Sequence, residues 1–228
     1  MGVKNGYGVW RSKSGESYIG QWVHGKAEGY GVHTWSNKDK YEGEWKNNLR
    51  HGNGSDFFKN GDQYVGQYKN GKPDGFGQYK WANDSAYTGQ FKDGLKHGNG
   101  KWRRKAYGEM TQRGNMYEGS YYQDKKHGVG YFEWESGNSY AGNYVFDERS
   151  GYGVMRWTDG SVYFGLWERG IQSGPGVMVF PDNSLKAGFF EKNVFKKAIK
   201  RLDDVEPYRK QLTDECLAHM KKFLQKGS

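Results

Sequence analysis

The sequence predicts an all-β protein, an antiparallel meander of about fifteen short strands in one thin layer, with a helical segment at its C-terminal end. Three observations lead to this prediction. Glycine and aromatic residues are abundant, a Tyr-x-Gly motif returns at a fixed period, and both features stop near residue 190.

The composition separates the chain from an ordinary globular or disordered protein. Hydrophobic residues make up only 34% of its 228 residues, yet it contains 36 Gly, 18 Tyr, 12 Phe and 9 Trp. Many rings with few aliphatic side chains predict a thin β-structure whose aromatic residues cover a small hydrophobic layer. The single cysteine, Cys216, excludes a disulfide framework and a cysteine-based zinc site. Because the sequence has neither a long apolar run nor an N-terminal signal pattern, we expect a cytoplasmic protein.

The Tyr-x-Gly motif sets the repeating unit. Units start at Tyr18, Tyr41, Tyr64, Tyr87, Tyr117, Tyr140 and Tyr163, with steps of 23 residues and a single step of 30. The longer step carries an insertion in the turn before Tyr117. Partial units remain at both ends, in "NGYGVW" and in "KAGFF". We therefore predict a repeat region over residues 1–190 and a separate segment over residues 191–228.

Each unit has the pattern of a β-hairpin. In "YIGQWVHG", alternation along a strand places Tyr18, Gly20 and Trp22 on one face, and "GYGVHTW" places Trp35 on the same face. Turn sequences such as "NGK", "KNGDQ" and "TDGSV" separate the strands. Glycine weakens a strand by itself, but a glycine opposite a ring leaves room for that ring to lie over the neighbouring backbone.

The opposite face is polar in the early units and apolar in the last ones. The apolar positions are Tyr152, Val154, Phe164, Leu166, Val177 and Val179. An apolar patch at one end of a repeat array needs a cover, and we predict that residues 191–228 supply it as an amphipathic helix or helix pair.

Within this tail, Phe195, Ile199 and Leu202 have near-helical spacing, and Asp203 or Asp204 caps a second helix with Pro207 in its first turn. The tail holds ten basic and five acidic residues from position 192 onward. A basic amphipathic helix for acidic membranes or a calmodulin-like partner is therefore the alternative.

Taken together, these units resemble the MORN repeat (membrane occupation and recognition nexus), whose pattern is Tyr-x-Gly-x-Trp-x-x-Gly-x-x-x-Gly-x-Gly. The resemblance covers roughly residues 5–190. It implies an elongated, twisted, groove-like single sheet with a binding or scaffolding role. Similar repeats occur in ciliary radial spoke components, in junctions between plasma membrane and reticulum, in accessory regions of lipid kinases, and in cytoskeletal adaptors that hold a target peptide in the groove.

The function that follows as an expectation is a non-enzymatic scaffold or adaptor. It would bind an extended or helical segment of a partner protein along the aromatic-lined groove, in a cytoskeletal, ciliary or membrane-contact assembly. The predicted groove residues are Tyr18, Trp22, Trp35, Tyr41, Glu44, Trp45, Tyr64, Tyr68, Trp81, Tyr87, Phe91, Tyr117, Tyr121, Trp134, Tyr140 and Trp157. Glu44 would pair with basic side chains of the bound segment. The expected location is the cytoplasm, with the cytoskeleton or a cilium, or peripheral at a membrane.

Two alternatives stay open. One is an anionic phospholipid-binding module that acts through Arg103, Arg104, Lys105 and the tail lysines. The other is a regulatory MORN region of a larger enzyme. We expect no cofactor, because no phosphate loop, nucleophile elbow or zinc-protease motif occurs.

Metal and nucleic-acid binding are not expected either. The histidines in "RHG" and "KHG" lie at one position of different units, so we expect them to line a ridge. The ligands of a metal ion would instead converge on one point. The net charge is +9, but about half of it lies in the tail, which argues against nucleic acid as a ligand of the repeats.

Overall fold

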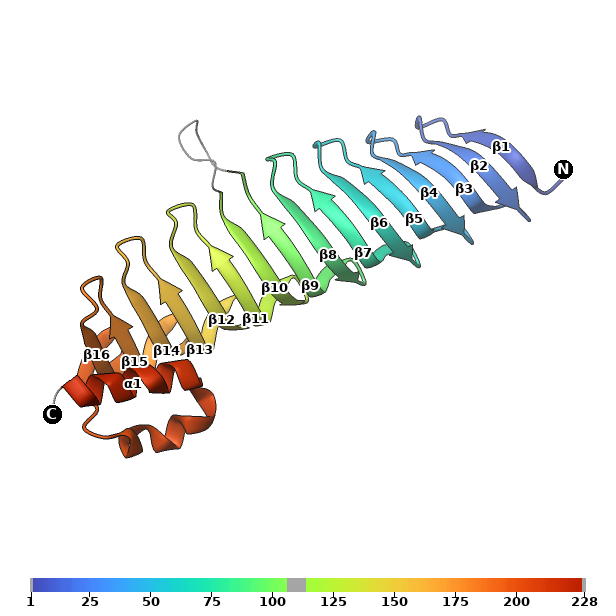
Figure 1. Cartoon of the computed structure of the whole chain (residues 1–228). Helices are drawn as coiled ribbons and strands as arrows, with labels where there is room; N and C mark the ends of the chain where they lie inside the picture. Colours follow the sequence, from blue (N-terminus) through green and yellow to red (C-terminus); the bar gives the residue numbers. More distant parts are fainter. Residues whose placement is uncertain (1, 106–113, 227–228) are drawn as a thin grey trace. The chain divides into compact units, whose positions relative to one another are not determined.

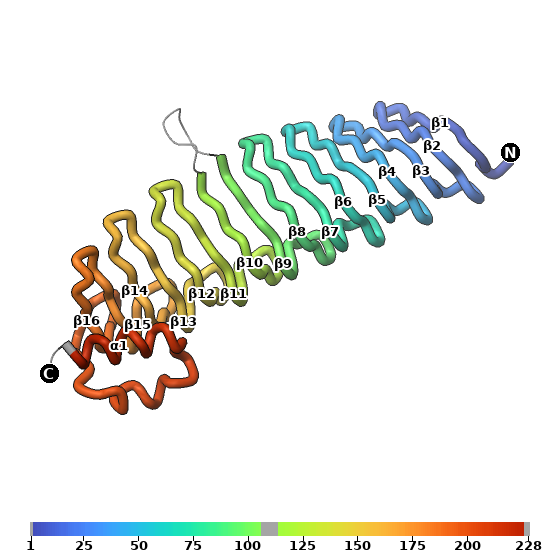
Figure 2. The backbone as a smooth tube through the Cα atoms, in the orientation of Figure 1, coloured from blue at the N-terminus to red at the C-terminus, as the bar shows by residue number. Residues whose placement is uncertain are grey.

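The computed structural model describes residues 2–105 and 114–226, which are drawn in colour in Figure 1. They belong to two compact units, Met1–Arg104 and Lys105–Ser228, and the division falls inside the predicted insertion. Each unit contains an open antiparallel sheet of hairpins, and the up-and-down course of the backbone is followed most easily in Figure 2. The predicted all-β repeat class is therefore confirmed.

The first unit is a sheet in which strands that follow one another in sequence also pair. Its strands are β1 (Gly6–Arg11), β2 (Ser17–Val23), β3 (Lys26–Thr34), β4 (Lys40–Lys46), β5 (Leu49–Phe57), β6 (Gln63–Lys69), β7 (Lys72–Lys80), β8 (Ala86–Lys92) and β9 (Leu95–Arg103). Glycines lie opposite one another across the strands, as in Gly8 with Gly20, Gly20 with Gly31, and Gly31 with Gly43. This glycine row crosses the sheet beneath the rings.

Tight turns hold each hairpin, and their residues are those that tolerate a left-handed backbone. Asn70 and Gly71 have φ values of 51° and 85°, and His24 and Gly25 have values of 48° and 76°. Two successive positive φ values are typical of the two-residue turn that matches strand twist. The "NGK" turn predicted from the sequence is therefore confirmed.

The second unit repeats this architecture and adds helices. Its elements are β10 (Met116–Tyr122), β11 (Lys125–Glu133), β12 (Ser139–Val145), β13 (Glu148–Arg156), β14 (Val162–Glu168), β15 (Ile171–Val179), β16 (Leu185–Glu191), β17 (Val194–Ala198), the 3-10 helix η1 (Leu202–Gln211) and α1 (Asp214–Lys226). The helix α1 packs against β15 and β16 (Figure 1).

The helical segment covers the apolar patch, as predicted. Cys216 and Met220 of α1 are fully buried, and they pack in one cluster with Phe164, Leu166 and Val177 of the sheet. Tyr152, Val154 and Val179 border the same cluster and are partly buried. The predicted cap over the apolar patch is therefore present.

The start of the tail differs from the expectation. Residues 194–198 form the strand β17, which pairs with β16, so the helical spacing of Phe195 and Ile199 was misleading. The turn before β17 continues the hairpin pattern of the preceding units, and this overrides local helix propensity. The expected capping role is also corrected in part. Asp204 accepts the backbone N–H of Lys200 at 2.6 Å and that of Arg201 at 3.1 Å, but Pro207 lies inside η1 beyond its first turn.

Candidate functional site

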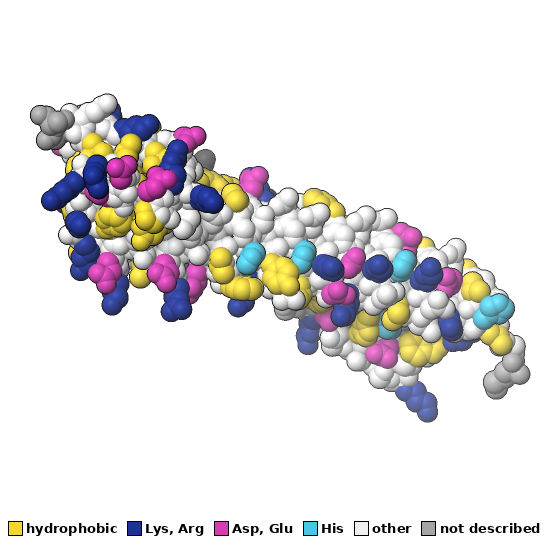
Figure 3. All heavy atoms as spheres, turned by 90° about the horizontal axis from the view of Figure 1, so that it is seen from below, with side chains coloured by type: hydrophobic (Ala, Val, Ile, Leu, Met, Phe, Trp, Pro, Cys, Tyr) yellow, Lys and Arg dark blue, Asp and Glu magenta, His cyan; other side chains and the backbone are white. Residues whose placement is uncertain are grey.

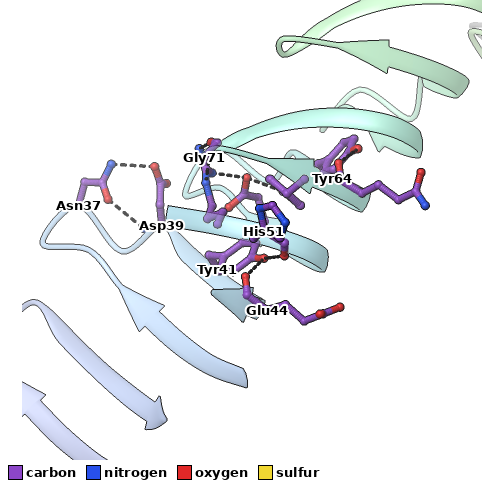
Figure 4. A network of polar contacts seen from close by, with 11 residues as sticks. Asn37, Asp39, Tyr41, Glu44, His51, Tyr64 and Gly71 are labelled. Atoms are coloured by element: carbon purple, nitrogen blue, oxygen red, sulfur yellow. Dashed lines mark hydrogen bonds and ion pairs between the residues drawn. The ribbon is translucent and has the colours of Figure 1, made fainter. Parts of the chain in front are cut away.

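The repeated tyrosine is the centre of every unit. Tyr41 is completely buried, and its hydroxyl donates to the backbone oxygen of Glu44 at 2.9 Å (Figure 4). The same bond to the residue three positions later recurs at Tyr18, Tyr64, Tyr87, Tyr117, Tyr140 and Tyr163. The ring needs the glycines beneath it, because a Cβ added at Gly54 would lie 2.3 Å from the Tyr41 hydroxyl oxygen. The predicted pairing of glycine with aromatic residues is thereby explained.

The rings pack edge to face along each sheet. Tyr41 contacts the ring of Trp45 in its own hairpin, with centroids 5.1 Å apart, and the ring of Tyr68 in the next one at the same distance. Such T-shaped pairs add about 0.5–1.5 kcal/mol each beyond the burial of their area. This aromatic ladder is the core of the sheet.

The ladder accounts for most of the predicted groove residues. Those that it buries are Tyr18, Trp22, Tyr41, Trp45, Tyr64, Tyr68, Tyr87, Phe91, Tyr117, Tyr121 and Tyr140. Burial raises the pKa of Tyr18 to about 12 and raises the pKa of Tyr41 further still. At neutral pH these hydroxyls are therefore uncharged hydrogen-bond donors that stabilise the fold.

Cationic side chains lie over the ladder at one repeat position. We call this set the cation row; its members are Lys4, Arg50, Lys96, Lys126 and Arg149. Arg149 is typical, because its guanidinium lies 4.3 Å from the ring centroid of Trp167 and burial lowers its pKa. Cation–π contact of this kind is favourable by about 0.5–2 kcal/mol, more when water is excluded.

One member of the cation row is fixed by a buried acid. Arg50 lies 2.6 Å from the carboxylate of Asp56, which is 4% exposed, and also donates to the backbone oxygen of Gly71. The hydroxyl of Tyr68 donates to the same carboxylate at 2.7 Å. We call Arg50, Asp56 and Tyr68 the buried triad. The corresponding residues of a later hairpin, Arg149, Met155 and Trp167, occupy the same places without an acid.

The cation row is interrupted twice in the first unit, at Ala27 and at Pro73, and the aromatic face is hollowed at Ala27. The hollow has a volume of about 540 Å³, and it is lined by Lys4, Trp10, Tyr18, Trp22, Ala27, His33, Trp35, Trp45, Asn48, Leu49, Arg50 and Gly71. Ala27 stands at the repeat position that Lys4 and Arg50 hold on either side. Because its methyl group cannot cover the rings, an open space remains between the two cations. We call this space the tryptophan hollow.

The electrostatics of the tryptophan hollow are simple. In its lining, His33 packs on Trp35 with ring centroids 4.4 Å apart, and burial lowers the pKa of this histidine. The imidazole is therefore neutral near pH 7. The cations stand at the two ends, and the described residues offer Lys4 no acidic partner, while Arg50 is held in the buried triad.

The remaining predicted residues divide between the rim and the other face. Trp35, Trp81, Trp134 and Trp157 are half-buried, at the ends of strands on the aromatic face. Glu44 points away from the ring of Tyr41, toward the opposite face (Figure 4). Its carboxylate accepts the backbone N–H of Asn53 at 2.8 Å. Arg103 and Arg104 are exposed at the end of the first unit, and Lys105 is exposed at the start of the second.

The opposite face of the first unit also has a hollow, of about 840 Å³, near Lys72, Asp74, Phe76 and Asp93. Its border mixes both charges and offers one exposed ring, so it is a weaker site for a protein segment than the tryptophan hollow. Acidic and basic side chains also alternate on the molecular surface seen in Figure 3.

Other kinds of site find no support among the described residues. No group of three or more His, Cys, Asp or Glu side chains in residues 2–105 and 114–226 is placed to hold a metal ion. Within the same residues no helix has the length and apolar character needed to cross a membrane. The buried thiol of Cys216, with its pKa raised by burial to about 12, is protonated at neutral pH.

Sequence reasoning missed Trp10, His33, Lys4 and Arg50 as members of the site. The signal that identifies them is a departure from the repeat: Ala27 replaces a cation, and Trp10 belongs to the incomplete first unit. A search for what the units share passes over such positions.

Comparisons with known proteins agree with the repeat pattern. A family model of the MORN repeat matches residues 1–17, 18–40, 41–63, 64–86, 87–105, 117–139, 140–162 and 163–185. No curated protein sequence matches the chain. Among solved structures, the chain is similar to the SAS-4 (dCPAP) TCP domain of Drosophila melanogaster, determined in complex with a proline-rich motif of Ana2 (dSTIL). The two are 11% identical, the match covers 81% of this chain and 90% of that chain, and the TM-score is 0.42. The TCP10 domain of Danio rerio CPAP is also 11% identical, with 83% and 99% covered and a TM-score of 0.28.

Proposed function

The chain belongs to the MORN-repeat family, and on that basis we propose that it is a non-enzymatic scaffold that holds a segment of a partner protein on its aromatic face. The observation that carries the proposal is the tryptophan hollow. Trp10 and Trp35, which are half-buried, form part of its wall beside the buried rings of Tyr18, Trp22 and Trp45. Interfaces concentrate their binding energy on such ring-lined pockets.

The chemistry of the hollow defines the segment that would fit it. The lining rings and the neutral imidazole of His33 suit one apolar, aromatic or proline side chain, which would displace water from the rings. Lys4, at one end, suits an acidic residue beside that anchor, because its ammonium group has no carboxylate partner among the described residues. We infer that the partner carries a short motif with one apolar anchor and an adjacent Asp or Glu.

The decisive variant is Ala27→Arg, which fills the hollow with the residue found at the same repeat position in Arg50 and Arg149. Because the repeat holds arginine at the equivalent positions 50 and 149, we expect Ala27→Arg to fold, and a urea midpoint equal to that of the unaltered chain would assign a loss of binding to the hollow. A library of random peptides is selected on the unaltered chain, and the selected peptides are then measured on both proteins by fluorescence anisotropy. We expect anchor-plus-acid motifs that bind Ala27→Arg at least about tenfold more weakly.

The matched control is Lys96→Arg, which keeps a cation on the row and leaves the tryptophan hollow unchanged. It should bind the selected peptides as the unaltered chain does. Peptides that bind Ala27→Arg with undiminished affinity would overturn the assignment of the hollow.

The cellular setting that we propose is a cytoskeletal, ciliary or membrane-contact assembly, as similar repeats suggest. The two alternatives make different predictions. A phospholipid module would co-sediment with anionic vesicles through Arg103, Arg104 and Lys105 at moderate salt, although both charges are interspersed on the surface seen in Figure 3. A regulatory region would change the activity of an enzyme to which it is joined.

A further inference from the structure

A row of apolar side chains crosses the second unit on the face opposite to the aromatic ladder. The register places each member directly across from the next, over strands β11 to β16. We call this set the apolar row; its members are Tyr131, Ala141, Val154, Phe164, Val177 and Ala187. One end of the row is covered, because Phe164, Val177 and Ala187 are buried in the cluster that α1 completes.

The other end of the apolar row is open to solvent. Tyr131 and Ala141 are exposed, and Val129, which precedes Tyr131 on the same face of β11, is 67% exposed. The rings of Tyr122 and Phe146 are also exposed and lie 6.3 Å apart at the turn ends of β10 and β12. We call this surface the uncovered patch; it consists of Tyr122, Val129, Tyr131, Ala141, Val145 and Phe146.

The uncovered patch is a departure from the repeat. In the unit that starts at Tyr41, Asn53 and Ser55 occupy the positions of Val129 and Tyr131. Both units form the same hairpin, so the hairpin does not require apolar side chains at these positions. A contiguous apolar surface that the fold does not need is typical of an interaction site.

A helix suits the uncovered patch better than a strand does. The strand β11 pairs with β10 and β12, and β12 also pairs with β13, so their backbone groups are not open to strand addition. The covered end of the apolar row has a helix in the same position. The thiol of Cys216 donates to the backbone oxygen of Phe164 in β14 at 3.6 Å, and α1 continues over β15 and β16 (Figure 1). The uncovered patch extends the surface on which α1 lies.

The acidic side chains at the uncovered patch favour a basic helix. Two carboxylates flank the exposed ring of Tyr131: Glu118 is its partner across the strands, and Glu133 accepts its hydroxyl at 3.1 Å. A third, Glu148, is exposed across from Val145. A helix with lysine or arginine beside its apolar face would bring opposite charge to these positions.

The basic side chains on this face are directed at rings of the chain itself. The ammonium group of Lys125 lies 5.7 Å from the ring centroid of Phe146, and the guanidinium of Arg156 lies 5.9 Å from that of Phe164. A second copy of the chain that paired through this patch would bring the same carboxylates together. Because like charges oppose such pairing, the charge favours a different protein as the occupant.

We propose that the uncovered patch binds an amphipathic helix of a partner protein. The apolar side chains of this helix would lie on Val129, Tyr131 and Ala141, and its lysines or arginines would lie beside Glu118 and Glu133. The patch belongs to the second unit and shares no residue with the tryptophan hollow. The chain would therefore hold two protein segments at separate sites.

The probe is a display library of helices of about 16 residues, which span about 24 Å. One face carries Leu, Ile, Phe or Met, and the flanking positions vary between Lys and Glu. The library is selected on the full chain, and single helices are measured by fluorescence anisotropy. We expect lysine to prevail at the flanks. Val129→Asn with Tyr131→Ser, which copies Asn53 and Ser55, should bind the selected helices at least about tenfold more weakly.

Matched variants separate the sources of binding. Glu118→Gln with Glu133→Gln should weaken binding at low salt and reduce its dependence on salt, because exposed charges are screened. Ala27→Arg should bind the helices as the unaltered chain does. Val129→Asn with Tyr131→Ser should keep its affinity for the peptides selected for the tryptophan hollow, and its urea midpoint should stay close to that of the unaltered chain, because both side chains are exposed.

Three results would overturn the proposal. One is undiminished helix binding in Val129→Asn with Tyr131→Ser, and another is a selection that yields no helix or prefers Glu at the flanks. The third is a dimer of the unaltered chain in sedimentation velocity that the same double variant dissociates, because the patch would then bind a second copy.

Discussion

Removing the carboxylate of the buried triad gives the sharpest test of the packing on the aromatic face. In Asp56→Ala, the guanidinium of Arg50 loses its partner at 2.6 Å and the hydroxyl of Tyr68 loses its acceptor at 2.7 Å. Breaking a buried ion pair costs about 3–5 kcal/mol. Because the Arg50 side chain is 28% exposed and keeps its bond to the oxygen of Gly71, we expect a smaller loss, about 2–3 kcal/mol.

The assay is urea unfolding, with hydrogen exchange to assign the loss to strands β4–β7. With a slope of about 2 kcal/mol per molar urea, the midpoint should fall by about 1 M. The chain offers a matched control, because Asp56→Met with Tyr68→Trp copies the residues beside Arg149. This double variant should recover to within about 1 kcal/mol of the unaltered chain, since apolar replacement of a buried pair is often neutral. An unaltered midpoint in Asp56→Ala, or a double variant as unstable as the single one, would show that the carboxylate does not stabilise the sheet in this way.

Two further predictions concern the cap and the hollow. The buried thiol of Cys216 should react with a disulfide reagent only when the cap opens. Met220→Ala should weaken the cap by about 2 kcal/mol or more and therefore speed labelling roughly 30-fold. The control Ala218→Ser, at an exposed position of the same helix, should leave the labelling rate unchanged. An unchanged rate in Met220→Ala would show that labelling does not report cap opening. Burial lowers the pKa of His33 in the folded state, so the unfolded chain binds its proton more readily and stability falls as pH drops below about 6.5. In His33→Phe, which copies Phe132 at the same repeat position, urea midpoints should depend less on pH between about 5.5 and 7; equal slopes would contradict the burial argument.

Most of the fold follows from the sequence, because one repeated contact dictates it. Once Tyr41 must lie over Gly43 and Gly54, the register of the hairpin, the face of each ring and the turn positions are set. The covered patch around Phe164 was also predictable, since six apolar residues cannot remain on one exposed end. The strand β17 was not, because Phe195 and Ile199 have a spacing that suits a helix and the pairing with β16 is a tertiary preference.

The site was less predictable than the fold. Listing the shared rings identified residues such as Tyr64 and Phe91, which the ladder buries. The tryptophan hollow depends instead on Ala27, whose small side chain leaves space beside the rings. That effect appears only when Lys4 and Arg50 are seen beside it in three dimensions.

The spacing of the aromatic ladder also affects how the length of such a repeat protein can evolve. The ring of Tyr41 contacts a ring of its own hairpin and a ring of the following one, so duplicating one 23-residue period recreates these ring contacts at the new junction. A gain or loss of a fraction of a period inside a strand would instead break the row of glycines beneath the rings. We therefore expect related chains to differ in length by whole repeat units, and single substitutions such as alanine at position 27 to distinguish one unit from the next.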